Sequence, residues 1–161
     1  MLIRDATSSD WPRIWPFLHE IVAAGDTFTY DPELGEVDAE DIWMVSAPGR
    51  VVVAAEHDDV VGTAKMYANQ AGPGAHIASA SYMVDPARHG RGVGRALVTD
   101  SLGWARAQGF QGMQFNAVAQ TNIYAIRLYE SLGFAVLGTV PGGFRHPVHG
   151  DVGLHVMFCP L

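Results

Sequence analysis

The chain contains 161 residues, of which 48% are hydrophobic, and it carries a formal net charge of −7 with a single cysteine. This composition is sufficient for one compact core, so we expect a single domain over residues 1–161. The negative charge argues against general nucleic-acid binding, and no apolar run approaches the roughly 18 residues that a membrane-spanning helix needs. Because Cys159 has no partner for a disulfide and Met1–Asp5 lacks the pattern of a signal peptide, we expect a cytoplasmic protein.

The N-terminal part of the chain is expected to form a strand followed by two helices. Residues 2–6 predict a short strand, and Thr7–Asp10 offers capping groups for the helix that follows. Pro16 is expected to kink this helix or to delay its start. A second, shorter helix is expected at residues 38–46, before the Pro-Gly pair that ends it.

The middle of the chain predicts three strands and then a helix. Residues 50–56 and 60–68 are rich in Val and Ala and are expected to form a hairpin. A strand at residues 75–84 then leads through a glycine-rich loop into an amphipathic helix at residues 92–107.

The C-terminal part predicts one further helix between strands. Residues 112–119 are expected as a strand, and the helix after it begins near Thr121 or Asn122 and ends at Gly133. Strands at residues 134–139 and 152–158 close the chain, joined by a loop rich in Gly, Pro and His.

The loop before the helix at residues 92–107 carries the strongest functional signal. It holds glycines at 90, 92 and 94 and arginines at 88, 91 and 95, in a chain with only ten Lys and Arg residues. Glycines let the backbone close around a ligand, and the first N–H groups of a helix attract anions, phosphate above all. The spacing fits neither the dinucleotide motif, because position 97 is leucine, nor the P-loop, because the only lysine is Lys65. A polyanionic cofactor is expected, and the alternative is a turn that merely joins strand to helix.

The sequence His89-Gly-Arg-Gly-Val-Gly94 resembles the Q/R-x-x-G-x-G/A signature of the GNAT family of N-acetyltransferases, with His89 at the Q/R position. In this family the loop holds the pyrophosphate of acetyl-CoA, mostly through backbone donors. The resemblance implies cofactor contacts from Met83, Val84, His89, Gly90, Arg91, Gly92, Val93, Gly94 and Arg95.

A second motif, Asn122, Ala125, Tyr129-Glu130 and Gly133-Phe134, supports the same resemblance. Asn122 and Tyr129 are seven residues apart, so they share one helix face at a separation of about 10 Å. In the family the asparagine contacts the cofactor arm and the tyrosine hydroxyl lies near its sulfur. The order of elements matches the family over nearly the whole chain, which implies an α/β (α+β) fold: a mixed sheet of about seven strands with splayed central strands and about four flanking helices.

The resemblance implies direct attack of an amine on the acetyl-CoA thioester. Val84 N–H is expected to polarise the carbonyl, and Tyr129 to donate a proton to the departing thiolate. Relatives often use a glutamate on the strand before the loop as general base, but residues 76–82 contain no carboxylate. His76, Glu56 and ordered water therefore stay open as alternatives. No metal is expected, because His146, His149 and His155 lack a matching set of Cys or carboxylate ligands.

The acceptor is expected to bind near the segment that follows the first helix. Residues 26–41 contain seven acidic residues and no Lys or Arg, which indicates either a wall that selects cationic amines or a solvated acidic loop. Gly25–Tyr30 resembles the substrate loop of the phosphinothricin and methionine-sulfone acetyltransferases, and other segments resemble enzymes that acetylate proline analogues. Substrate contacts are expected from Phe28, Tyr30, Ser79 and Asn116, although relatives acting on proline analogues carry Asn where Ser79 stands.

These observations predict a small amine or amino-acid-like compound as the acceptor. The residues Phe144, Arg145 and His146 are expected to contact it from a loop at the pocket mouth. The alternatives are a protein lysine or N-terminal acetyltransferase and a non-catalytic acyl-CoA-binding module. A homodimer through the closing strands and helices is also open.

Overall fold

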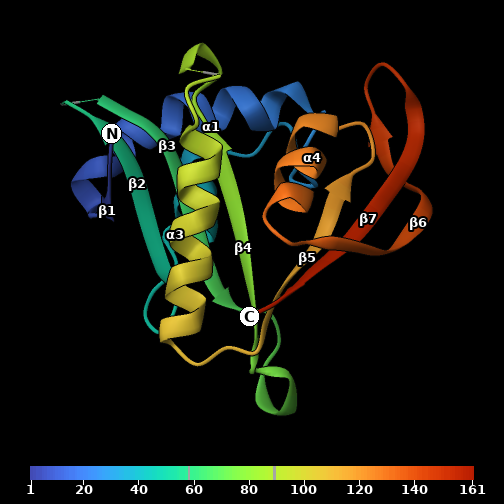
Figure 1. The fold of residues 1–161 in the computed structure, drawn as a ribbon. Helices are drawn as coiled ribbons and strands as arrows, with labels where there is room; N and C mark the ends of the chain where they lie inside the picture. The colour runs from blue at the N-terminus through green and yellow to red at the C-terminus, as the bar shows by residue number, and fades with distance from the viewer. Residues whose placement is uncertain (58, 89) are drawn as a thin grey trace.

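The computed structural model describes residues 1–57, 59–88 and 90–161. It contains a seven-stranded mixed sheet in the order β1-β2-β3-β4-β5-β7-β6 (Figure 1). The strands are β1 (Leu2–Asp5), β2 (Arg50–Glu56), β3 (Asp59–Ala68), β4 (Ile77–Val84), β5 (Gly112–Ala119), β6 (Ala135–His146) and β7 (Gly150–Pro160). The α-helices are α1 (Trp11–Ala24), α2 (Glu36–Trp43), α3 (Val93–Ala107) and α4 (Ile123–Ser131).

The first helix begins where the capping residues predict, but Pro16 does not delay its start. Thr7 and Asp10 form a capping box around the short 3-10 turn Ser8–Asp10, which leads directly into α1. The Asp10 carboxylate also accepts two hydrogen bonds from Arg4, at 2.7 and 2.8 Å. Helix α1 then runs continuously from Trp11 through Pro16 to Ala24. Its apolar face, which includes Ile14 and Leu18, is fully buried, and this burial outweighs the backbone hydrogen bond that proline removes.

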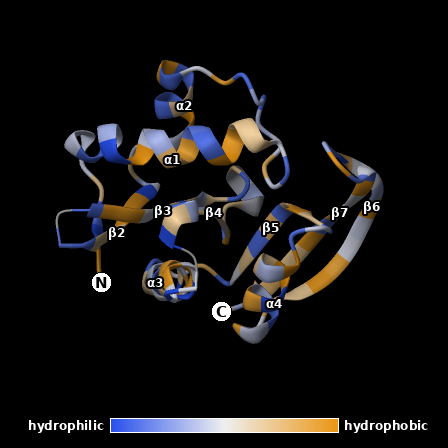
Figure 2. Ribbon diagram, turned by 90° about the horizontal axis from the view of Figure 1, so that it is seen from above, coloured by the Kyte–Doolittle hydropathy of each residue, from blue (hydrophilic) through white to orange (hydrophobic). Residues whose placement is uncertain are grey.

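The core has two layers, one on each face of the β2–β3–β4 sheet. Helices α1 and α2 cover one face and α3 covers the other, as Figure 2 shows from above. Because side chains alternate along a strand, Val51 and Val53 of β2 pack towards α1 and α2, whereas Val52 and Ala54 pack towards α3. Helix α2 ends at Trp43 rather than at residue 46, since the backbone of Met44 leaves the helical region. None of the helices in the described part of the chain has the length and apolar character to cross a membrane.

The expectation of splayed central strands is confirmed. The parallel strands β4 and β5 pair only at Ile77 with Gly112 and at Ala78 with Met113, and then diverge (Figure 1). Aromatic rings occupy the space between them, with the ring centroid of Tyr82 on β4 lying 5.8 Å from that of Phe115 on β5. The divergence opens the sheet at the carboxyl end of β4, where the glycine loop begins.

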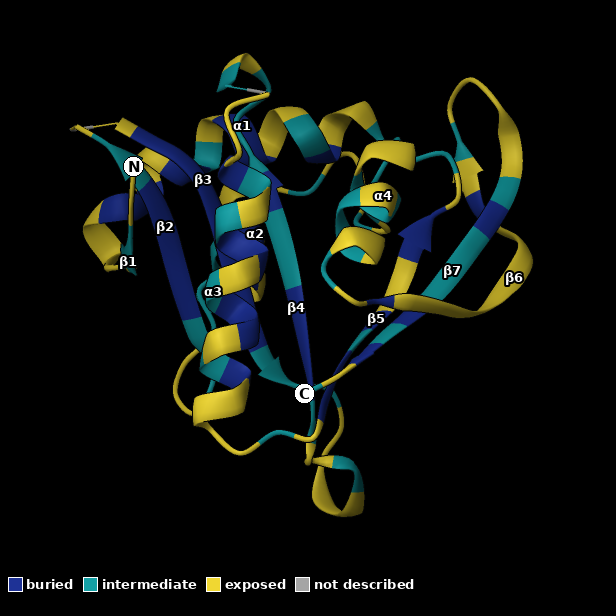
Figure 3. Cartoon of the chain, in the orientation of Figure 1, coloured by how far each residue is buried: buried dark blue, intermediate teal, exposed yellow. Residues whose placement is uncertain are grey.

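The expected loop between the last two strands is largely wrong. Strand β6 extends to His146 and β7 begins at Gly150, so only residues 147–149 connect them. The sequence of β6 contains glycines and a proline that are typical of a loop. Two register shifts, at Val136/Gly138 and Val140/Phe144, nevertheless allow β6 to stay hydrogen-bonded to β7 along this segment. Strand β6 forms the edge of the sheet, and most of its residues are exposed (Figure 3).

Close packing of α3 on β3 yields a first prediction. A Cβ added at Gly62 of β3 would lie 2.8 Å from Val93 Cγ1, at the start of α3, and 3.1 Å from the Met83 carbonyl oxygen. We therefore expect Gly62→Ala to lower the free energy of unfolding by about 1–3 kcal/mol, as overpacking does in other cores. Chemical denaturation measures this, with Gly138→Ala as control, because a Cβ there meets nothing within 4 Å. Equal stability of both variants would contradict the packing argument.

Candidate active site

The glycine loop adopts the backbone conformation that an anion site requires. Gly90 and Gly92 both have φ of 78°, a left-handed conformation that glycine adopts readily, and Gly92 is the N-cap of α3. Among the described residues, no side chain caps this helix start, and a Cβ added at Gly90 or Gly92 would meet no described atom within 4 Å. The first N–H groups of α3 therefore lie beside open space, where a phosphate group fits. His89, which is part of the expected signature, lies outside the described residues.

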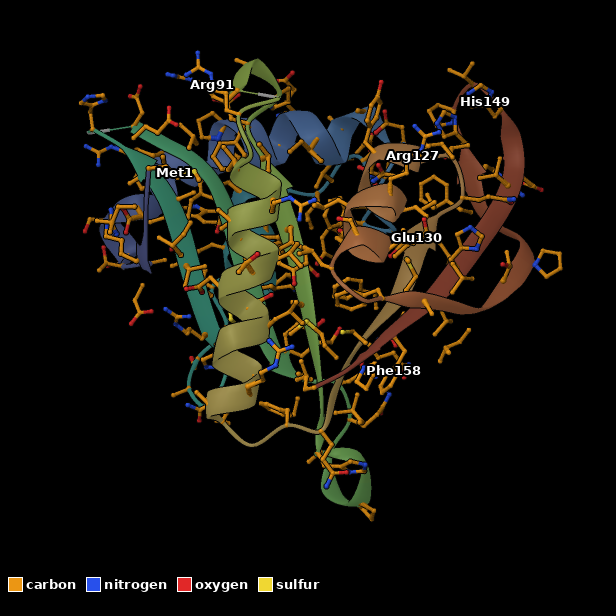
Figure 4. All side chains as sticks on the ribbon, viewed as in Figure 1. Met1, Arg91, Arg127, Glu130, His149 and Phe158 are labelled. Atoms are coloured by element: carbon orange, nitrogen blue, oxygen red, sulfur yellow. The ribbon has the colours of Figure 1, made fainter. Side chains whose placement is uncertain are left out.

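Two arginines of the loop region are already engaged with carboxylates of the β2–β3 hairpin. Arg88 donates a hydrogen bond to Asp59 at 2.8 Å, and Arg91 lies 3.4 Å from Glu56. Figure 4 labels Arg91 beside the loop that precedes α3. Arg88 also lies 4.0 Å from Glu56, so two carboxylates hold it. Arg91 has the longer contact and a side chain that is 55% exposed, so it is the freer of the two to exchange its partner for another anion.

Arg95 is placed differently, between two helices. Its guanidinium donates a hydrogen bond to Ser131 Oγ on α4 at 2.8 Å, and no carboxylate among the described residues lies within ion-pair distance of it. Gly94, the residue before Arg95, packs close to α4, because a Cβ added there would contact Leu128 at 3.4 Å. The guanidinium group of Arg95 therefore lies where α3 and α4 approach each other.

The backbone of β4 directs donors into the opening between the splayed strands. Asn69 N–H donates to Ile77 O, and Asp85 N–H donates to Val61 O, so the odd-numbered residues of β4 face β3. Since backbone groups alternate in direction along a strand, Val84 N–H points the other way, towards β5. Beyond Ala78 the described part of β5 does not pair with β4, so this amide is free to donate to a ligand. Met83, by the same alternation, turns its backbone to β3, and its side chain is buried against α1 and α2.

A cavity of about 270 Å³, which we call the central cavity, lies beside this opening. Its walls come from the segment after α1, from β3, from both splayed strands and from α4. It is lined by Thr27, Phe28, Thr29, Tyr30, Tyr67, Ser79, Ala80, Ser81, Tyr82, Phe115, Asn116, Ala117, Val118, Ala119, Asn122 and Tyr129. The tertiary structure therefore brings together all four expected substrate residues, Phe28, Tyr30, Ser79 and Asn116, with Asn122 and Tyr129.

Tyr129 is held rigidly with a free hydroxyl group. Its ring packs against Phe115, with centroids 4.7 Å apart, and against Phe134, at 5.9 Å. Burial raises the pKa of Tyr129 above its ordinary value, so the phenol stays protonated at neutral pH. Its hydroxyl has no hydrogen-bond partner in the described part of the chain, whereas that of the neighbouring Tyr82 bonds to Ser101 Oγ at 2.6 Å. Of these two tyrosines, Tyr129 has the hydroxyl free to meet a ligand.

Asn122 caps α4 with its side chain. Its Oδ1 accepts a hydrogen bond from Ala125 N–H at 3.3 Å, as the predicted helix start requires. This bond orients the amide so that Nδ2 remains as a donor at the wall of the central cavity.

Asn116 is positioned by a β-bulge and by a residue that the sequence analysis missed. The pairing of β5 with β7 shifts between Phe115 and Val118, and this irregularity contains Asn116. Asn116 Oδ1 accepts hydrogen bonds from Gln114 at 2.8 Å and from Asn69 at 3.3 Å, and Asn116 Nδ2 donates to Asn69 Oδ1 at 2.6 Å. Asn69 follows β3 and Asn116 lies on β5, so the paired hydrogen bonds between their amides, which we call the amide bridge, cross over β4. No motif in the sequence links the two asparagines.

The acidic segment after α1 does not form a wall of the cavity. None of the seven acidic residues at positions 26–41 is among the described lining residues, and most of them are exposed. Of the two interpretations of this segment, the structure favours the solvated loop. Its aromatic residues Phe28 and Tyr30 instead face inward, with their rings stacked 5.6 Å apart.

The side chains considered as general bases also lie away from the cavity. His76 is exposed before β4 and its Nδ1 donates a hydrogen bond to Pro73 O at 3.1 Å, while Glu56 contacts the arginines of the glycine loop. The expected substrate contacts from residues 144–146 are not found at the described cavity wall, because these residues lie within strand β6 and Phe144 is buried. The cavity lining described here contains no acidic or basic side chain.

Comparison with known proteins agrees with this geometry. Residues 13–134 match the model of the Acetyltransferase (GNAT) family. The chain is similar to the structure of a GCN5-related N-acetyltransferase from Kribbella flavida, with 55% identity, a TM-score of 0.97 and coverage of 99% of this chain and 97% of that one. It is 27% identical to N-acetyltransferase aca1 from Schizosaccharomyces pombe, over 83% of this chain and 71% of the relative.

A third relative shares the fold with acetyl-CoA bound. The phosphinothricin acetyltransferase from Sinorhizobium meliloti, solved in complex with acetyl-CoA, aligns with a TM-score of 0.88 over 99% of this chain and 88% of that one. At 24% identity this likeness concerns the fold alone. The family match covers most of the chain, and the glycine loop, splayed strands and central cavity are the parts such a transferase requires. The chain therefore belongs to the GNAT acetyltransferase family and is an acetyl-CoA-dependent N-acetyltransferase.

Proposed function

We propose that the protein acetylates the amine of a small, amino-acid-like acceptor by direct attack in a ternary complex. The observation that carries this proposal is the central cavity, which is about 270 Å³ in volume and is lined by Ser79–Tyr82 of β4 and by Tyr129 of α4. This volume lies just below the range of about 300–1,000 Å³ that is usual for ligand pockets, so it suits a small molecule rather than an extended peptide. Phe28 and Tyr30 close one side of it, where a protein substrate would need an open groove.

The residues of the glycine loop fit the phosphates of acetyl-CoA. The N–H groups at the start of α3 would hold the pyrophosphate, with Arg91 and Arg95 supplying positive charge beside it. Asn122 Nδ2 would donate to the amide-containing arm between the splayed strands. Acetyl-CoA supplies a thioester, whose carbonyl carbon an amine can attack.

Two groups of the chain would act on the reacting atoms. Val84 N–H would donate to the thioester oxygen, where negative charge develops during attack. The Tyr129 hydroxyl, which burial keeps protonated, would give its proton to the sulfur as the thiolate leaves. Because the described cavity lining holds no carboxylate or histidine, we propose that water carries away the proton of the attacking amine.

The amide bridge supports an acceptor that bears oxygen atoms. Asn116 Oδ1 already accepts two hydrogen bonds, and one Nδ2 hydrogen is used by Asn69. The second Nδ2 hydrogen of Asn116 therefore remains free of described partners at the cavity wall, where it can be donated to an oxygen atom of the acceptor. Ser79, which stands where some relatives carry asparagine, adds a hydroxyl to the same wall.

The position of Arg95 leads to a prediction on cofactor binding. We expect Arg95→Gln to raise the KM for acetyl-CoA about tenfold with little change in kcat, because one charge-assisted hydrogen bond to phosphate is lost. Initial rates over a range of acetyl-CoA concentrations measure this. Arg88→Gln is the matched control, since Arg88 is bound to Asp59 in the absence of cofactor and should leave the KM nearly unchanged. A larger effect at Arg88 than at Arg95 would overturn this assignment of the cation.

Thiol release from acetyl-CoA across a panel of amines tests the proposed function. The panel contains free amino acids, proline analogues, phosphinothricin-like compounds, polyamines and lysine peptides. Turnover with amino-acid-like compounds is expected. Turnover confined to peptides would instead identify a protein acetyltransferase, and cofactor binding without turnover on any amine would identify a binding module.

A further inference from the structure

Lys65, the only lysine of the chain, is buried directly behind the wall of the central cavity. It lies on β3 and is 6% exposed, and its Nζ donates a hydrogen bond to Ile42 O at 2.9 Å. Three aromatic rings surround the ammonium group, with Nζ lying 5.4 Å from the ring centroid of Trp43, 5.6 Å from that of Tyr67 and 5.7 Å from that of Tyr30. Lys65 therefore sits in a cage of aromatic rings.

The charge of Lys65 is not cancelled by a neighbouring carboxylate. The ion pairs found among the described residues do not include Lys65, so no described carboxylate lies within 4 Å of Nζ. Its polar partner is the carbonyl of Ile42 in the last turn of α2, where the helix dipole favours a cation. Burial lowers the pKa of Lys65 to about 8, so the amine stays mostly protonated at neutral pH.

Two of the three caging rings belong to the cavity wall itself. Tyr30 and Tyr67 contact the ammonium group with their rings and also line the central cavity. The described lining contains no acidic or basic side chain that would oppose this charge. In a partly buried, low-dielectric setting a unit charge acts over several ångströms, so we expect the ammonium group to make the potential more positive on the side of the cavity formed by Tyr30 and Tyr67.

We propose that Lys65 makes the central cavity select acceptors that carry a carboxylate or another anionic group over neutral or dicationic amines. This inference rests on the proposed function, because it assumes that the acceptor occupies the central cavity. Lys65 is a specificity-determining residue that acts through the aromatic wall and does not touch the acceptor. A purely structural role, in which Lys65 only anchors the end of α2, predicts no dependence on the charge of the acceptor.

Binding of two probes of nearly equal size, in which the amine is already acetylated and therefore uncharged, tests the inference without turnover. N-acetylglycine carries a carboxylate, and N-acetylglycinamide carries a neutral carboxamide in its place. We expect the wild-type protein to bind the acid about tenfold more tightly than the amide in calorimetric or NMR titrations, a difference of about 1.4 kcal/mol. Equal affinities of the wild-type protein for the two probes would overturn the inference, whatever the variants do.

Lys65→Met separates charge from packing, because methionine keeps an unbranched apolar side chain in the cage. We expect it to abolish the preference for the acid while the affinity for the amide changes less than about twofold. Arg13→Met, which removes an exposed charge on α1, is the matched control and should keep the preference. Parallel loss of both affinities in Lys65→Met would indicate a structural role. Charge-selective binding in a protein that acetylates no amine would overturn the proposed function, whereas acetylation of small amines without charge-selective binding would overturn this inference alone.

Discussion

Tyr129→Phe is expected to lower kcat about a hundredfold while the affinity for acetyl-CoA changes little, because the variant loses only the proton donor. The ring of Tyr129 packs against Phe115 and Phe134, and phenylalanine preserves these contacts. Steady-state kinetics gives kcat, and calorimetry gives the cofactor affinity. Tyr124→Phe on the same helix is the matched control, since the Tyr124 side chain is 89% exposed and its hydroxyl faces solvent. Unchanged turnover in Tyr129→Phe would remove this residue from the chemistry.

The same residue has a consequence for the pH dependence of the rate. An acid must be protonated to act, and burial raises the pKa of Tyr129 above its ordinary value of 10.0. Its contribution is therefore fully present at neutral pH and is lost only as the pH rises through the raised pKa. We expect kcat to show no decrease attributable to Tyr129 below pH 10.0. A decrease near neutral pH that is absent in Tyr129→Phe would contradict this assignment.

Gly92→Ala is expected to raise the KM for acetyl-CoA by about tenfold or more, because alanine disfavours the left-handed backbone that opens the anion site. Gly92 has φ of 78°, and this conformation costs a non-glycine residue roughly 1–2 kcal/mol. We expect the backbone at position 92 of the variant to leave the left-handed conformation, which would turn the first N–H groups of α3 away from the phosphates that they would bind. Initial-rate kinetics and calorimetric titration with CoA both measure the loss.

Gly103→Ala is the control for this experiment. Gly103 lies inside the same helix, is exposed, and has open space around an added Cβ. Alanine is favoured over glycine within a helix by roughly 0.5–1 kcal/mol, so this variant should be slightly more stable and bind the cofactor normally. A KM in Gly92→Ala equal to that in Gly103→Ala would show that the loop does not hold the cofactor.

Local sequence patterns predicted the helices and strands well where the tertiary packing favours the same secondary structure as the pattern. The hairpin of β2 and β3, strand β5 and helix α3 all appear within two residues of their expected bounds. The predictions were wrong where tertiary contacts outweigh local preference. Of the two alternatives for Pro16, the delayed helix start is wrong, because α1 begins before Pro16 and its neighbours are buried. The glycines of β6 are accommodated in a strand because bulges maintain its pairing with β7.

The candidate site shows the same division. Gly90, Gly92, Asn122 and Tyr129 belong to contiguous motifs whose spacing corresponds to a loop or a helix face. The glycines alone indicated an anion site, and the resemblance of both motifs to the GNAT family implied an acetyl-CoA-dependent acyl transfer. Lys65 and Asn69 belong to no motif, since their roles depend on contacts with residues more than twenty positions away. Only the tertiary structure decided that the acidic segment is solvated, that the asparagines form a bridge and that a buried cation stands behind the cavity. Burial, electrostatic environment and amide orientation depend on which residues lie close together in the folded protein. Local sequence patterns do not show these contacts when the residues are far apart in the chain.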